Sequence, residues 1–156
     1  METKSLIIDI VLFSIIAVPL AVLVIYTING DKRIKRKVNT LCKANNIALG
    51  SFDIHGNVVL GLDTTATKLI LSNRKQIDTE FQIIELSSLK DCRVKTIKLT
   101  PKTTDWVGLE LLGTTTKKDI AFYEEKDEDN PATDPQVCMQ QAIKWEKLIK
   151  PHLKAS

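Results

Sequence analysis

The chain has 156 residues, enough for one domain and an additional element but too few for two ordinary domains. With 44% hydrophobic residues, 26% charged residues and a net charge of +3, its overall composition is that of an average soluble protein. That average hides a division, because 19 of the 23 residues at positions 6–28 are hydrophobic. A lipid-like segment joined to a polar remainder disfavours a free cytosolic enzyme, a disordered protein and a polytopic transporter.

Residues 6–28 are predicted to form a transmembrane helix. At about 1.5 Å per residue the run is roughly 34 Å long, enough to cross a hydrocarbon core of about 30 Å. A core helix of a soluble protein would show a polar stripe, whereas this run carries a single charged residue, Asp9, near its start. A cleaved signal peptide is the alternative, but the run is longer than a usual signal sequence and lacks a small-residue cleavage site.

Three features inside the span could serve a function or could simply be tolerated in a membrane anchor. Asp9 is expected to reach the nearby interface rather than to act inside the membrane, and Pro19 is tolerated in such helices. Ala17 and Ala21 form a small-xxx-small pair that would let two helices pack closely, although the pattern is common by chance.

A cluster of cations after the span predicts its orientation. Five of the six residues at positions 32–37 are basic, namely Lys32, Arg33, Lys35, Arg36 and Lys37. The positive-inside rule then places the N-terminus outside the cell (inner) membrane and the C-terminal bulk in the cytoplasm. The three cysteines are odd in number and widely spaced, which agrees with free thiols in a reducing compartment.

Residues 31–46 are predicted to form a juxtamembrane amphipathic helix with Asp31 as its N-cap. Its apolar face is formed by Ile34, Val38, Leu41 and Cys42, which follow the helical period. The basic residues of this helix would meet anionic lipid headgroups. They would equally serve as a topology signal alone, while nucleic-acid binding is disfavoured because the rest of the chain has no basic surplus.

The following region is predicted to be a meander of about seven short strands, because turn signals recur every 8–12 residues or so. The expected strands lie at residues 52–54, 58–63, 68–72, 81–86, 92–99, 106–112 and 120–123. Residues 87–91 are expected to form a short turn. An acidic loop at residues 124–131 precedes a helix that is capped by Asp134, begins at Pro135 and ends before Pro151. Its apolar face would consist of Cys138, Ala142, Trp145 and Ile149.

This order of elements resembles the bacterial PH-like (pleckstrin-homology-like) domains over residues 48–153. The resemblance rests on the strand end at residues 61–63 with the strand at 68–71, on residues 84–92 before the fifth strand, and on Trp145 in the last helix. It implies a mainly β fold with α, a seven-stranded antiparallel partial barrel capped by a C-terminal amphipathic helix. It also implies binding of lipids, peptides or other domains. Residues 51–63 contain no Lys or Arg, a departure from phosphoinositide-binding members.

A catalytic, cofactor or metal motif is not found, and none is expected. His55 lies in a predicted turn and His152 near the chain end, so both are expected at the surface. The cysteines lack the spacing of a zinc site, and the acidic loop lacks the glycine and glutamate of a calcium loop. Trp145 is expected in the core, whereas Trp106, at a strand start, could contact a partner or the bilayer.

Together these features predict a membrane-tethered cytoplasmic interaction module that is not an enzyme. It would bind an unidentified protein partner, an anionic lipid surface, or both, and no nucleic acid. The alternative is a structural or accessory subunit of a larger membrane complex, packed through Ala17 and Ala21. An enzyme with a site of scattered carboxylates has the least support.

Overall fold

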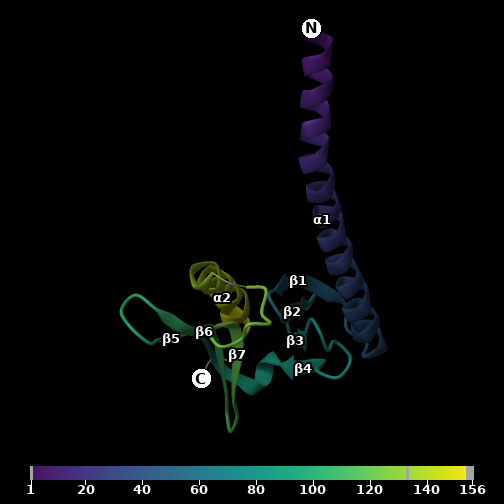
Figure 1. The fold of residues 1–156 in the computed structure, drawn as a ribbon. Helices are drawn as coiled ribbons and strands as arrows, with labels where there is room; N and C mark the ends of the chain where they lie inside the picture. The colour runs from purple at the N-terminus through teal and green to yellow at the C-terminus, as the bar shows by residue number, and fades with distance from the viewer. Residues whose placement is uncertain (1, 133, 154–156) are drawn as a thin grey trace. The chain divides into compact units, whose positions relative to one another are not determined.

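The computed structural model describes residues 2–132 and 134–153. It contains one long N-terminal helix, seven antiparallel strands in two sheets and a C-terminal helix (Figure 1). The chain divides into two compact units, Met1–Arg36 and Lys37–Ser156. The first unit is helical throughout its described residues, and the second holds both sheets and the C-terminal helix.

Helix α1 (Glu2–Ala44) contains a stretch near the N-terminus that is long and apolar enough to cross a membrane. The large apolar side chains of this stretch, from Leu6 to Ile28, are exposed, from 47% at Ile28 to 79% at Tyr26. The hydroxyls of Ser14 and Thr27 donate hydrogen bonds to helix carbonyls one turn earlier, at 2.8 and 2.9 Å. The polar side chains of these two residues are therefore satisfied within the helix, as a segment in hydrocarbon requires.

The sequence predicted two helices, one ending at residue 28 and a second beginning at Asp31. This division is wrong, because α1 passes through residues 29–31 without interruption. Asp31 is therefore an interior residue of the helix and not an N-cap. None of these three residues is a proline, so each has an N–H that can continue the helical hydrogen-bond ladder. Extending an existing helix costs less free energy than ending it and nucleating a new one.

The last turns of α1 belong to the second unit, where Val38 and Cys42 are fully buried. After Ala44 the chain reverses at Asn46, whose φ of 58° lies in the left-handed region. The N–H of Ile47 donates to the carbonyl of Cys42 at 2.8 Å, and the N–H of Asn46 donates to that of Lys43 at 3.1 Å. This is a Schellman motif, in which the buried side chains of Cys42 and Ile47 occupy its hydrophobic positions.

The first sheet has the order β1-β2-β3-β4, with every neighbouring pair antiparallel. Its strands are β1 (Leu49–His55), β2 (Val58–Asp63), β3 (Lys68–Asn73) and β4 (Gln82–Glu85). The β1–β2 turn consists of Gly56 and Asn57, and the φ of Gly56 is +59°. A two-residue hairpin of this kind needs a positive φ at its first position, which glycine adopts without steric cost.

The second sheet has the order β5-β6-β7 and is also antiparallel. Its strands are β5 (Leu89–Lys98), β6 (Thr104–Gly113) and β7 (Lys117–Glu124). The connection from β4 is a short 3-10 helix, η1 (Leu86–Ser88), so β5 begins inside the segment expected to be a turn. Leu86 and Leu89 are both buried, and their burial fixes this tight connection.

The seven expected strands are therefore present, but within the described residues the two sheets are not joined into a closed barrel by any strand pair. Side chains from both sheets and the C-terminal helix form the main core: Leu60, Leu62, Leu69, Leu86, Leu89, Cys92, Val107, Leu109, Leu111, Ile120, Phe122, Cys138, Ala142, Trp145 and Ile149. Successive strand residues point to opposite faces. Val59 and Ile70 therefore lie on the other face of the first sheet, and both are fully buried there as well.

Helix α2 (Pro135–Ile149) contacts all three strands of the second sheet (Figure 1). The Asp134 carboxylate caps it by accepting a hydrogen bond from the N–H of Gln136 at 2.8 Å. The predicted apolar face is confirmed, since Cys138, Ala142, Trp145 and Ile149 are at most 1% exposed. Pro151 lies in a terminal 3-10 turn, η2 (Lys150–His152), that follows directly.

Candidate functional site

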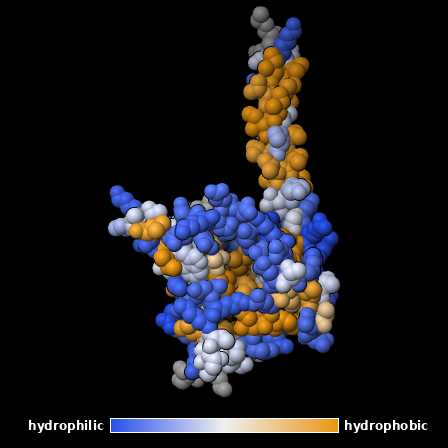
Figure 2. Space-filling view, turned by 60° about the horizontal axis from the view of Figure 1, so that its bottom comes forward, coloured by the Kyte–Doolittle hydropathy of each residue, from blue (hydrophilic) through white to orange (hydrophobic). Residues whose placement is uncertain are grey.

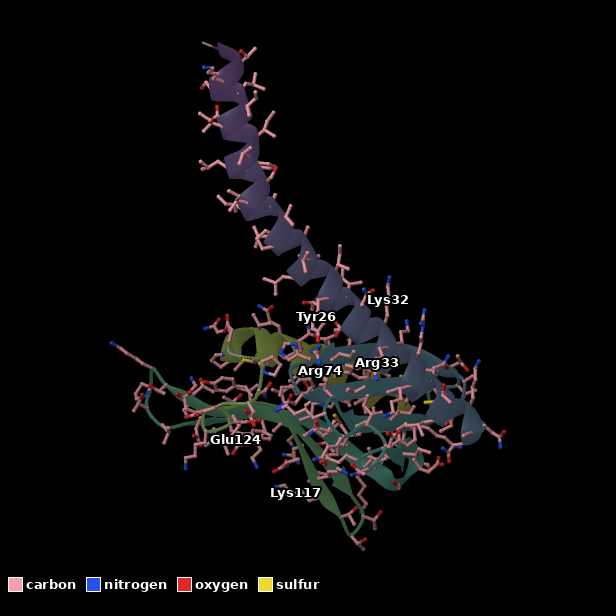
Figure 3. The ribbon with its side chains drawn as sticks, turned by 45° about the vertical axis from the view of Figure 1, so that its right-hand side comes forward. Tyr26, Lys32, Arg33, Arg74, Lys117 and Glu124 are labelled. Atoms are coloured by element: carbon pink, nitrogen blue, oxygen red, sulfur yellow. The ribbon has the colours of Figure 1, made fainter. Side chains whose placement is uncertain are left out.

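The basic run of the sequence lies on α1 just after its apolar stretch. All five side chains are exposed: Lys32, Arg33, Lys35, Arg36 and Lys37. At 100° per residue they occupy an arc of roughly 200° around the helix. Figure 3 shows Lys32 and Arg33 on α1. Lys37, the first residue of the second unit, forms an ion pair with Asp78.

Tyr26 is a residue of this region that the sequence analysis did not single out. Its side chain is 79% exposed and lies six positions before Lys32 on the same helix (Figure 3). Tyrosine at the end of an apolar span is typical of the headgroup level, where the ring is apolar and the hydroxyl is wet. The signal was available in the sequence as an aromatic residue within three positions of the end of the run.

Ala17 and Ala21 lie one turn apart on the same face of α1. Ala21 is exposed and Ala17 is partly exposed. Among the bulky neighbours on this helix, the two alanines form a shallow position that a second helix could approach.

Trp106 is half-buried in β6 and does not lie in an exposed loop. Its cross-strand partner in β5 is Ile97. The Lys95 ammonium lies 5.6 Å from the centre of the Trp106 ring, within the range of a cation–π contact. The ring also covers Gly108, where an added Cβ would come within 2.6 Å of it. Trp106 is therefore held in place by three neighbours and keeps part of its surface exposed.

A network of charged side chains crosses the second sheet and involves all three strands. The Glu110 carboxylate pairs with the ammonium of Lys117 at 2.5 Å, with Arg93 at 3.4 Å and with Lys95 at 3.8 Å. Lys95 also pairs with Asp119 at 3.2 Å. The hydrogen bond from Lys117 lowers the pKa of Glu110 below its usual value. These charges compensate one another, so the network stabilises the sheet more than it attracts a charged ligand.

His55 and Cys138 meet although they are 83 positions apart in sequence. The His55 Nε2 lies 3.2 Å from the Cys138 Sγ, and the imidazole packs on the Phe122 ring. His55 is thus half-buried, contrary to the surface position expected from the sequence. Burial lowers the pKa of His55, with Asp53 opposing the shift, and burial raises the pKa of Cys138 to about 11. At neutral pH this is a pair of uncharged groups, unlike the thiolate–imidazolium pair of a cysteine nucleophile.

Asp63 is a nearly buried carboxylate whose partners are all local. Its oxygens accept hydrogen bonds from the N–H groups of Thr67 and Lys68, at 2.7 and 2.9 Å, and from the hydroxyls of Thr65 and Thr67. Burial opposes ionisation of Asp63, but these hydrogen bonds outweigh it and lower the pKa. The carboxylate therefore organises the β2–β3 turn, in which Ala66 adopts a φ of 53°.

A cleft of about 290 Å³ lies between β7 and the side of the first sheet that carries β3 and β4. Its acidic side chains, all exposed, are Glu80, Asp119, Glu124 and Asp127. Its apolar side chains, buried or partly buried, are Val58, Leu71, Ile120 and Ala121. The cleft thus combines buried or partly buried apolar side chains with four exposed carboxylates and one lysine, Lys118. Asn57 also lines it and has a buried Oδ1 without a hydrogen-bond partner among the described residues.

Within residues 2–132 and 134–153, no group of His, Cys, Asp and Glu side chains is arranged to hold a metal ion. The three cysteines are free and fully buried. Burial raises the pKa of Cys42 and raises that of Cys92 to about 12. The structure brings the five cations together on one helix and places Trp106 elsewhere, on the second sheet.

Comparison of the chain with family models, with curated proteins and with solved structures gave no match.

Proposed function

We propose that the protein is a single-pass, membrane-anchored interaction module. The span would place the N-terminus outside the cell membrane and the β domain in the cytoplasm, where the domain binds a protein partner close to anionic lipid. The observation that carries this proposal is the exposed apolar stretch of α1 followed directly by five exposed cations.

The apolar stretch supports an anchor because water is an unfavourable solvent for it. Its large apolar side chains from Leu6 to Ile28 are at least 47% exposed. Burying one such side chain completely is worth about 1.5–3 kcal/mol. On the membrane-insertion scale, each Leu, Ile, Phe or Val contributes about 0.3–0.6 kcal/mol, so the run as a whole gains roughly 5–10 kcal/mol when lipid covers it.

The basic run supports both the orientation and the proximity of the domain to lipid. Cations near an anionic leaflet contribute about 1 kcal/mol each. The segment between the span and the second unit comprises residues 29–36, only eight residues. An anchored domain is thereby confined to a thin layer at the membrane, where its effective concentration toward a partner in that layer is raised.

A PH-like type is proposed for the domain because of its element order, with four strands, then three strands, then one helix. We propose a protein partner for the domain itself, rather than a phosphoinositide, because residues 51–63 contain no Lys or Arg. The cleft beside β7 supports this choice, since its apolar side chains and its excess of four carboxylates over one lysine suit a basic segment of a polypeptide.

A structural or accessory role in a larger membrane complex is the second candidate. Ala17 and Ala21 support it, because small side chains four residues apart permit close contact between helices. In that case the anchor would recognise other membrane helices, and replacing it by a polyleucine span would abolish assembly. An anchor that acts only as a tether would tolerate the replacement.

Energy transfer from a dye on the domain to a lipid dye tests the proposed role of the basic run. The full chain carries the dye at Thr115→Cys, an exposed position between β6 and β7, in nanodiscs with or without phosphatidylglycerol. Transfer should be higher in the anionic discs. The variant with Lys32, Arg33, Lys35 and Arg36 changed to Gln should lose this increase, because four lipid contacts are removed.

The matched control changes four other exposed lysines to Gln, namely Lys43, Lys90, Lys126 and Lys147. It alters the net charge by the same amount and should retain the increase. Equal transfer in both lipids for the native chain would show that the basic run does not hold the domain at anionic lipid. An equal loss in the control would show that net charge, and not the basic run, sets the response.

A further inference from the structure

Apolar side chains are exposed at one end of the second sheet. Of the described residues from 37 to 153, three large apolar side chains are exposed, namely Ile97 at 43%, Leu99 at 63% and Val137 at 43%. Ile97 and Leu99 belong to the hairpin that joins β5 to β6. Figure 1 shows this hairpin as an arm that extends away from α2, and Figure 2 shows hydrophobic residues on it. We call residues 97–103 the hairpin tip.

The hairpin tip is a turn held by backbone hydrogen bonds, and this backbone conformation keeps its apolar side chains exposed. The N–H of Leu99 donates to the Thr103 carbonyl at 3.0 Å. The N–H of Thr103 donates to the Thr100 hydroxyl at 3.0 Å and to the Thr100 carbonyl at 3.2 Å. A register shift between Ile97 and Lys98 turns the strand just before the tip. Such shifts re-aim side chains at strand ends.

The hairpin tip carries only positive charge. It contains Lys98 and Lys102, both exposed, and no acidic residue. Lys95, just before the tip, lies over the half-buried Trp106 ring, which is the cross-strand neighbour of Ile97. Exposed aliphatic side chains, flanking lysines and an aromatic ring form the composition of segments that enter the headgroup region of a bilayer.

We propose that the hairpin tip is a second membrane contact, in which Ile97 and Leu99 enter the interface of an anionic bilayer and Lys98 and Lys102 bind its headgroups. This inference rests on the proposed function, because the anchor supplies the bilayer and confines the domain near it. A protein occupant fits less well, since a stable interface needs about 800 Å² from each partner, more than a turn of seven residues offers.

The contact would fix how the anchored domain is turned. A single span does not by itself set the tilt of an anchored domain against the bilayer. A second attachment at the hairpin tip would restrict that tilt and so determine which surfaces of the domain face the cytoplasm.

A spin label at Leu99→Cys on the full chain tests the proposal. The three native cysteines are fully buried and stay unlabelled under native conditions. The reference label is at Thr115→Cys in the β6–β7 turn, which is also exposed but has no apolar residue. Both proteins are placed in nanodiscs of phosphatidylcholine alone or mixed with phosphatidylglycerol. Accessibility to oxygen, which concentrates in lipid, and to a water-soluble nickel chelate is then measured.

In anionic discs the label at position 99 should gain oxygen accessibility and lose nickel accessibility, while the label at position 115 should not change. Changing Lys98 and Lys102 to Gln should reduce the equilibrium ratio of inserted to free hairpin tip at least about tenfold, because two favourable headgroup contacts are lost. Lys90→Gln with Lys126→Gln is the matched control and should leave insertion unchanged.

A label at position 99 that remains equally aqueous in both lipids overturns the proposal. So does protection of that label only in discs that hold two or more copies of the chain, which would indicate a contact between protein copies. Flotation of the same discs and alkaline extraction of the chain from membranes report the anchor separately. Extraction of the chain refutes the proposed function, whereas an anchored chain with an aqueous label at position 99 refutes this inference alone.

Discussion

The first 28 residues and the β domain use the same apolar residue types in opposite ways. In α1 the side chain of Leu20 is 57% exposed, whereas in β6 that of Leu109 is fully buried. The β domain supplies its own apolar environment through two sheets and α2. The apolar stretch of α1 has no such cover among the described residues of the first unit, and we propose that lipid supplies it. The comparison shows that one average composition describes two parts, one that exposes its apolar side chains and one that buries them.

The largest expected effect comes from placing charges in the span. Ile15→Arg combined with Val18→Arg should prevent stable membrane integration, because two arginines near the centre of a span cost about 5–7 kcal/mol. The measurement is the fraction of chain that resists alkaline extraction. Thr114→Arg with Thr115→Arg, in the exposed β6–β7 turn, is the control and should remain integrated. Integration of both variants would contradict the assignment of residues 6–28 to lipid.

The next effect compares the same change, leucine to alanine, in the core of the β domain and in the apolar stretch of α1. Leu109→Ala should lower the free energy of unfolding of the domain by about 2–5 kcal/mol, because it leaves a cavity in the main core. Leu20→Ala should leave domain stability unchanged. Urea unfolding of the full chain in detergent, followed by tryptophan fluorescence, measures both. Equal losses in the two variants would mean that the span and the core unfold as one structure.

A smaller effect is expected from two turns of the first sheet. Gly56→Ala should destabilise the domain by about 1–2 kcal/mol, because an L residue is strained at a φ of +59°. The added Cβ would also overlap the Asn130 side chain. Ala66→Gly, at a φ of 53°, should have the opposite sign and stabilise by up to about 1 kcal/mol. The same unfolding assay reports both, and equal signs would contradict the turn geometry.

The smallest effect is a pH dependence from His55. Burial lowers its pKa in the folded state. The unfolded chain therefore binds more protons just below pH 6.5, the ordinary value, and stability should fall as the pH falls through that region. His55→Phe should remove this slope. Asp63, whose pKa is also lowered, contributes only below its ordinary value of 3.8, so the two regions are distinct. A slope unchanged by His55→Phe would refute the assignment.

Local patterns predicted much of the fold. Asp134 and Pro135 marked the start of α2, and the helical spacing identified Trp145 as a core residue. The prediction of an N-cap at Asp31 was wrong, because a residue that favours N-caps can also lie inside a helix that continues on both sides of it. The pairing order within each sheet follows the order of the strands along the chain, but whether the two sheets close depends on contacts between β strands far apart in sequence.

The candidate sites divide in the same way. The basic run at residues 32–37 could be found from composition because its members are adjacent in sequence. The contact between His55 and Cys138 could not, since it depends on how α2 settles on the sheets. The cleft beside β7 likewise combines residues from 57 to 130, which become neighbours only after folding. The sequence indicated a contact near the hairpin tip only through Trp106, which could contact a partner or the bilayer.

The topology of the chain in intact cells tests the central claim most directly. Single cysteines at Ser5 and at Thr115, both exposed, are treated with a membrane-impermeant maleimide before and after permeabilisation. The native cysteines are buried and provide no background in the folded protein. We expect position 5 to react in intact cells and position 115 to react only after permeabilisation. Reaction at position 115 in intact cells, or recovery of the chain in the soluble fraction, would contradict a cytoplasmic β domain held by a single transmembrane anchor.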